Sequence, residues 1–118
     1  MSREIKFRAW DKEANLWAGP DYFYIDGFGV PHWTETKQAD EDLILMQFTG
    51  LLDKNGEEIC EGDIVKDCSH SDMIFEIKWD NDWGGYCLPK EFDKEYNYPL
   101  TEIDCEVVGN IYENPELL

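Results

Sequence analysis

The chain has little positive charge and no long apolar run, and each shortage excludes a class of partner. Its 118 residues carry 10 Lys and Arg against 27 Asp and Glu, for a net charge of −17. Binding to nucleic acid needs Lys and Arg to replace phosphate counterions, so no direct nucleic-acid partner is expected. The same charge disfavours an anionic membrane surface. No apolar run approaches the roughly 20 residues of a membrane helix, so we expect no membrane partner.

Metal-ligand and leader patterns are also missing. The four cysteines form no CxxC pair, and the two histidines have no spacing typical of ligands. A zinc site usually places two ligands about two to four residues apart, so we expect no metal and no cofactor. The N-terminal string MSREIKFRAW is charged and lacks the apolar core of a signal peptide. We therefore predict a cytoplasmic protein with free thiols.

No catalytic pattern stands out, so we predict that the protein is not an enzyme and has no catalytic residues. The string Cys68-Ser69-His70-Ser71 is suggestive, but adjacent side chains in a turn rarely meet in the geometry of a triad. With 27 acids, pairs of carboxylates arise by chance. A small hydrolase or metal-dependent enzyme remains an alternative, and it requires a pocket where acids or His70 converge.

The chain does contain many short strand patterns separated by turn signals. In residues 48–65, FTGLLDKNGEEICEGDIV, the Asn55-Gly56 pair lies between apolar runs, which is the strongest short-range hairpin signal. Apolar alternation or short apolar runs predict further strands at 5–10, 22–25, 43–48, 73–79 and 105–112. Residues 34–42 are polar and predict an exposed loop. Asn114-Pro115 predicts a short helical turn.

These patterns predict a mainly β fold in two parts. Residues 1–48 are expected to form a small N-terminal β unit. Residues 49–118 contain five or six short strand patterns with turn signals between them. This spacing is typical of a small, strongly bent barrel of the Src-homology kind, here followed by the short C-terminal helical turn.

Aromatic content and uneven charge point toward protein contacts. The chain holds five Trp, six Tyr and six Phe, and exposed aromatic residues often mark interfaces. Residues 1–12 carry a net charge of about +2, so the acidic excess lies in the remainder of the chain. A basic first strand on an acidic body predicts docking against another copy or against its own body. The alternative is a solvated acidic surface that keeps the protein soluble.

Six residues follow from this as candidate interface positions. Four come from the basic first strand and two from the aromatic residues around the acidic loop at 80–82: Arg3, Lys6, Arg8, Trp10, Trp83 and Tyr86. For the second pair, the alternative is structural. In that alternative Trp79 belongs to the core, and its two aromatic neighbours cover it.

Three strings resemble the YopX family. They are REIKFRAWD at 3–11, LMQFTGLLDKNGEEICEGDIV at 45–65 and VVGNIYENPELL at 107–118, whereas residues 16–42 match nothing in the family pattern. The family consists of small phage and prophage proteins, so the resemblance implies the cytoplasm of a host bacterial cell. It also implies a β-rich fold with a C-terminal barrel-like domain, and it allows for oligomers. It supplies no activity and no catalytic residues.

The predicted function is that of a phage or prophage accessory protein that acts through protein–protein contacts. We expect a homo-oligomer, with a host or phage protein as a further partner. An alternative is an acidic DNA-mimic inhibitor, whose carboxylates imitate phosphates and occupy a host nucleic-acid-binding protein.

Overall fold

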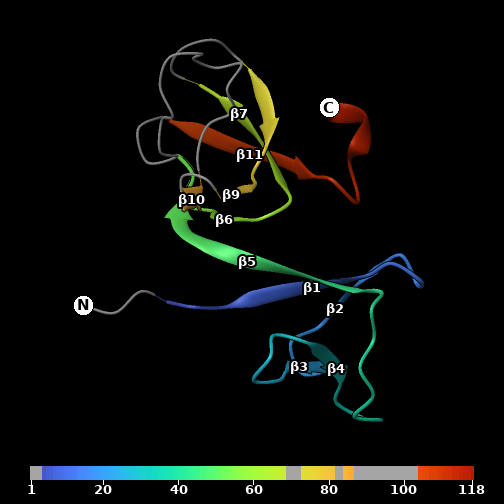
Figure 1. Cartoon of the computed structure of the whole chain (residues 1–118). Helices are drawn as coiled ribbons and strands as arrows, with labels where there is room; N and C mark the ends of the chain where they lie inside the picture. Colours follow the sequence, from blue (N-terminus) through green and yellow to red (C-terminus); the bar gives the residue numbers. More distant parts are fainter. Residues whose placement is uncertain (1–3, 69–72, 82–83, 87–103) are drawn as a thin grey trace. The chain divides into compact units, whose positions relative to one another are not determined.

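The computed structural model describes residues 4–68, 73–81, 84–86 and 104–118 (Figure 1). Its regular structure is β-strand plus one C-terminal 3-10 turn, η2 (Pro115–Leu117), so the predicted mainly β fold and helical turn are confirmed. No described helix is long and apolar enough to cross a membrane. In chain order the strands are β1 (Phe7–Asp11), β2 (Leu16–Ala18), β3 (Phe23–Ile25), β4 (Pro31–Trp33), β5 (Leu43–Leu52), β6 (Glu58–Cys60), β7 (Asp63–Asp67), β8 (Ile74–Glu76), β9 (Trp79–Asp80), β10 (Gly85–Tyr86) and β11 (Cys105–Asn110).

The chain divides into two compact units, here called the N-terminal unit (Ile5–Gln47) and the C-terminal unit (Phe48–Leu118, to which Glu4 also belongs). In the N-terminal unit, β1 pairs antiparallel with both β2 and β5, and β3 pairs with β4 as a hairpin. The turn between β1 and β2 forms because Asp11 Oδ1 accepts the backbone N–H groups of Glu13 and Ala14. Asn15, which tolerates positive φ, then turns the chain at +60°.

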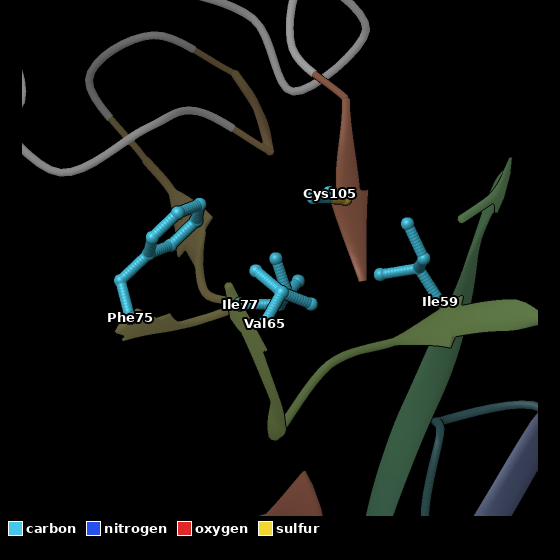
Figure 2. Packing of buried hydrophobic residues seen from close by; sticks show 5 residues of the cluster. All are labelled: Ile59, Val65, Phe75, Ile77 and Cys105. Atoms are coloured by element: carbon cyan, nitrogen blue, oxygen red, sulfur yellow. The ribbon is translucent and has the colours of Figure 1, made fainter. Parts of the chain in front are cut away.

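The strands of the C-terminal unit form a strongly curled half-barrel with small sheets, as the bent-barrel pattern predicts. Its three-stranded sheet has the order β11-β7-β8, and all of its pairs are antiparallel. The core lies between these strands and β6. It consists of Ile59, Val65, Phe75, Ile77 and Cys105 (Figure 2).

The predicted hairpin at Asn55-Gly56 is present, but its turn differs in detail from the expected one. The usual Asn-Gly hairpin turn has positive φ at both residues. Here, within the pair, only Gly56 has positive φ, at +83°, and the carboxylate of Asp53 holds the turn through hydrogen bonds. Asp53 Oδ1 accepts N–H groups from Asn55 and Glu57, while its Oδ2 accepts the N–H of Val107 in β11. One buried carboxylate therefore joins the hairpin to a strand far along the chain.

The strand predicted over 73–79 is shorter than expected. β8 ends at Glu76, and Trp79 begins a separate strand, β9. The alternative that Trp79 belongs to the core is wrong, because Trp79 is 46% exposed while Phe75 and Ile77 are buried. Ile77 N–H donates to the Asp63 carbonyl, outside the regular ladder, and this irregular step breaks the alternation.

Gly109 in β11 lies both at a bulge and at a close approach to another segment. The register with β7 shifts between Val107 and Gly109. A Cβ added at Gly109 would lie 2.6 Å from Asn114 Oδ1, the same oxygen that accepts the N–H of Asn110. The C-terminal turn is thereby packed onto a residue without a side chain.

Three cysteines in the described part of the chain are free thiols: Cys60, Cys68 and Cys105. Burial raises the pKa of Cys105 to about 11, with nearby acids adding to the effect. This thiol therefore stays protonated at neutral pH and acts as a small core side chain. Cys68, in contrast, is exposed. Cys87 lies outside the described residues.

Candidate functional site

The predicted interface residues of the first strand lie on β1 or just before it. Trp10 is only 4% exposed and places its ring edge-on to Trp17, with 5.0 Å between the ring centroids. The guanidinium of Arg8 lies 4.6 Å from the Trp17 ring centroid, and its Nη2 donates to Met46 Sδ at 3.8 Å. Lys6 is half-buried. Trp10 and Arg8 therefore already make contacts inside the N-terminal unit.

Of the remaining predicted interface residues, only Tyr86 lies among the described ones. Tyr86 in β10 is half-buried, packs against the core cluster and lies edge-on to Trp79 at 5.1 Å between ring centroids. Arg3 and Trp83 lie outside the described residues, and so does His70 of the hydrolase alternative. Among residues 4–68, 73–81, 84–86 and 104–118, no group of three or more His, Cys, Asp or Glu is placed to hold a metal ion.

The most exposed large apolar side chain in the described part of the chain is Phe28, at the tip of the β3–β4 hairpin. It is 95% exposed, yet the backbone beneath it is tightly held. Asp26 Oδ1 accepts the N–H groups of Phe28 at 2.8 Å and Val30 at 3.0 Å. Gly29 supplies a positive φ of +81°, which a glycine adopts without strain. The tip thus presents an aromatic ring to solvent from a fixed backbone.

His32 contacts the turn that carries Phe28, through Asp26. His32 Nε2 lies 2.8 Å from Asp26 Oδ2, and its Nδ1 lies 3.1 Å from the carbonyl oxygen of Lys37. The Tyr24 ring stacks on the imidazole, with 5.0 Å between centroids and 6° between planes. Because both ring nitrogens face oxygen acceptors, only the protonated imidazolium can donate to both. We call Asp26, His32 and Tyr24 the hairpin brace.

The electrostatics of the brace follow from these contacts. The hydrogen bond to Asp26 is the main cause that raises the pKa of His32, and the Lys37 carbonyl adds to it. The same hydrogen bond, followed by the N–H groups of Val30 and Phe28, lowers the pKa of Asp26. The carboxylate and the imidazolium are therefore both charged between the lowered pKa of Asp26 and the raised pKa of His32.

We expect the hairpin brace to loosen as the pH rises. A raised folded-state pKa means that the stabilisation of the hairpin by His32 is fully present below the unfolded pKa of about 6.5. It is then lost as the pH rises through the folded pKa. An NMR titration should show the His32 ring and the Phe28 amide changing together, with one midpoint above the unfolded value. His32→Gln should abolish this transition at the Phe28 amide; a Phe28 amide that ignores the titration of His32 would contradict the expectation.

A pocket of about 440 Å³ lies beside the same hairpin, between Tyr22 and the turn that follows β4. Two aromatic side chains and two acids line it together with small or polar residues: Tyr22, Trp33, Glu35, Asp40, Thr36, Gln38 and Ala39. Trp33 Nε1 donates to Asp40 Oδ2 at 2.7 Å, and Asp40 Oδ1 accepts the N–H of Asp42 at 2.9 Å. These bonds, the Trp33 one foremost, lower the pKa of Asp40, so the pocket holds a carboxylate at neutral pH.

The segment predicted as an exposed loop, 34–42, is exposed over most of its length but has more order than expected. Lys37 N–H donates to the Trp33 carbonyl at 2.7 Å, and Trp33 N–H donates to the Gln38 carbonyl at 3.0 Å. Lys37 adopts a positive φ of +63°, and Ala39 forms an isolated bridge with His32. The pocket wall is therefore a hydrogen-bonded turn. Sequence reasoning missed it because these bonds follow no repeating pattern.

Comparisons with known proteins give a consistent family. A family model described as "YopX protein" matches residues 6–118. Protein EF1440 from Enterococcus faecalis, a crystal structure, is 30% identical over 99% of both chains, with a TM-score of 0.64. The yopX protein from Bacillus subtilis, an X-ray structure, shares the fold at 20% identity over 99% of both chains, with a TM-score of 0.59. The search of curated proteins found no match.

Proposed function

This chain belongs to the YopX family, and we propose that it is a phage or prophage accessory protein that acts without catalysis, through protein–protein contacts, and self-assembles. The observation that carries the proposal is Phe28, a large apolar side chain that is 95% exposed on a backbone held by Asp26. An exposed aromatic residue on a preorganised backbone loses little conformational entropy on binding. Such residues are typical anchors of interfaces.

Other exposed apolar side chains support the N-terminal unit as the contact surface. Within the 26 residues 5–30, this unit exposes large apolar side chains at eight positions: Ile5, Phe7, Leu16, Trp17, Tyr22, Tyr24, Phe28 and Val30. Single exposed apolar residues are ordinary on protein surfaces. This many aromatic rings in one short segment instead favours an interface, where Tyr, Trp and Phe are enriched.

The charge distribution favours a second copy as the partner. Residues 1–12 hold four Lys and Arg against two acids, while the chain as a whole carries a net charge of −17. Two copies therefore offer each other surfaces of opposite sign, which steers association and fixes orientation. The exposed rings supply apolar burial, at about 25 cal/mol per Å² of surface removed from water.

Phe28→Ala is expected to weaken self-association at least tenfold, because truncating an aromatic anchor typically costs about 2 kcal/mol or more. Light scattering across a concentration series gives the dissociation constant for the wild type and the variant. Leu52→Ala is the matched control, since Leu52 is an exposed apolar residue of the C-terminal unit. Equal dissociation constants for wild type and Phe28→Ala would remove the hairpin tip from the interface.

A further inference from the structure

We propose that the pocket between Tyr22 and Trp33 binds a positively charged side chain, the guanidinium of an arginine, presented by the partner protein. The inference rests on the proposed function, because it takes the N-terminal unit as a recognition surface. It adds the chemistry of the residue that this surface accepts. The pocket of about 440 Å³ falls within the range of ligand sites, roughly 300–1,000 Å³.

The two aromatic walls of the pocket, Tyr22 and Trp33, are suited to hold a cation. Tyr22 is 69% exposed, so its ring is available to a guest. The Trp33 ring is fixed, because its Nε1 donates to Asp40 and its backbone is bonded to Lys37 and Gln38. A cation over the face of Trp or Tyr is attracted by the ring, and the planar guanidinium of arginine also stacks on such faces.

Two acidic side chains of the pocket favour a positively charged guest. Asp40 and Glu35 both line the pocket, and the Trp33 hydrogen bond holds the Asp40 carboxylate in place. Residues 19–42 contain six Asp and Glu against a single Lys, Lys37, which is not among the lining residues. The local charge therefore remains negative. Arginine suits a carboxylate beside an aromatic ring because its fork of N–H donors reaches the acid while its plane stacks.

The two aromatic rings and the two carboxylates together determine which class of ligand fits the pocket. Two carboxylates alone offer few donors for a divalent metal ion, which prefers about six to eight oxygen ligands when it is calcium. An anion would meet two negative groups, and no Lys or Arg is among the described residues that line the pocket. A neutral apolar guest would cover the two carboxylates without supplying an opposite charge. An organic cation uses both the rings and the acids.

The test is an NMR titration with three blocked tripeptides that carry arginine, lysine or citrulline between glycines. Citrulline has the shape of arginine without its charge. We expect saturable shifts of the Trp33 indole N–H and of the Gln38 and Ala39 amides with the arginine peptide, smaller ones with lysine and none with citrulline. Equal shifts with arginine and citrulline, or no saturable shift at these positions with arginine, would overturn the proposal.

A matched pair of variants separates the pocket from the general acidity of the protein. Glu35→Gln and Glu13→Gln remove the same charge from exposed residues of the same unit, but only Glu35 lines the pocket. Glu35→Gln should weaken arginine binding roughly threefold or more, and Glu13→Gln should leave it nearly unchanged. Equal effects of the two variants would contradict a site at this pocket.

The outcome can be separated from that of the proposed function. Phe28 does not line the pocket, so Phe28→Ala should keep arginine binding while it weakens self-association. Loss of arginine binding alongside intact Phe28-dependent assembly would overturn this inference alone. Arginine binding without any self-association would instead contradict assembly and leave a cation site that serves a different protein partner.

Discussion

Replacing Asp53 with Ala is expected to lower the free energy of unfolding by about 3 kcal/mol. Asp53 is only 7% exposed, and its carboxylate accepts three backbone N–H groups, from Asn55 at 2.8 Å, Glu57 at 2.9 Å and Val107 at 2.9 Å. Alanine removes all three acceptor contacts. The cost is large because the Val107 bond links the hairpin to β11, 54 residues away.

The stabilisation that Asp53 provides depends on pH, because its hydrogen bonds change its pKa. Burial alone raises the pKa of Asp53, but the N–H groups of Val107, Glu57 and Asn55 outweigh burial and lower it overall. A lowered folded-state pKa means that the stabilisation is present above the unfolded value of about 3.9. It is lost as the pH falls through the folded pKa. In acid, the wild type should therefore lose the part of its unfolding free energy that comes from the Asp53 carboxylate. Asp53→Ala lacks this carboxylate, so its stability should not change for this reason.

Urea denaturation of the wild type, Asp53→Ala and Asp53→Asn measures both effects. Asparagine keeps one oxygen acceptor but turns an N–H donor toward groups that are themselves donors, so we expect an intermediate loss. Denaturation curves at neutral and acid pH should converge between wild type and variants as the acid titrates. An Asp53→Ala protein within about 0.5 kcal/mol of the wild type would show that this carboxylate does not hold the C-terminal unit together.

Ile59→Ala is the second change with a large expected effect, about 3 kcal/mol of unfolding free energy. Ile59 in β6 is 1% exposed and belongs to the core cluster with Val65, Phe75, Ile77 and Cys105 (Figure 2). Truncation removes buried methyl groups and leaves a cavity among side chains that come from separate strands. The loss therefore includes a transfer contribution and a cavity contribution.

A graded series keeps this prediction testable by the same denaturation measurement. Ile59→Val removes one methyl group and should cost about 1 kcal/mol. Leu52→Ala truncates an exposed side chain and should stay within about 0.5 kcal/mol of the wild type. If Ile59→Ala cost no more than Leu52→Ala, the cluster shown in Figure 2 would not be the core of the C-terminal unit.

Local turn chemistry explains which parts of the fold were predictable. The Asn55-Gly56 pair and Gly109 carry their own signals, because a hairpin turn and a close approach each require particular residue types. The bond from Asp53 to Val107 carries no such signal, since its two residues lie 54 positions apart. The alternation of 73–79 predicts one continuous strand, but the chain leaves the ladder after Glu76, where Ile77 N–H donates to the Asp63 carbonyl.

The candidate site was less accessible to sequence reasoning than the fold. Its aromatic and acidic composition was visible, but the hairpin brace depends on His32 meeting both Asp26 and Lys37 across turns. Phe28 did carry a usable signal. It stands between Gly27 and Gly29 in a turn, where a large apolar side chain has little chance of burial. The six interface positions came instead from charge and from aromatic neighbours.

The solution mass of the unmodified protein shows whether the chain self-associates. Light scattering at about 50 and 500 mM salt separates apolar from charged contacts, because the Debye length falls from roughly 10 Å near 0.1 M to 3 Å at 1 M. We predict a mass that rises above 13.9 kDa with concentration at both salts, with weaker association at the higher one. A mass of 13.9 kDa at every concentration and salt would contradict assembly through the N-terminal unit.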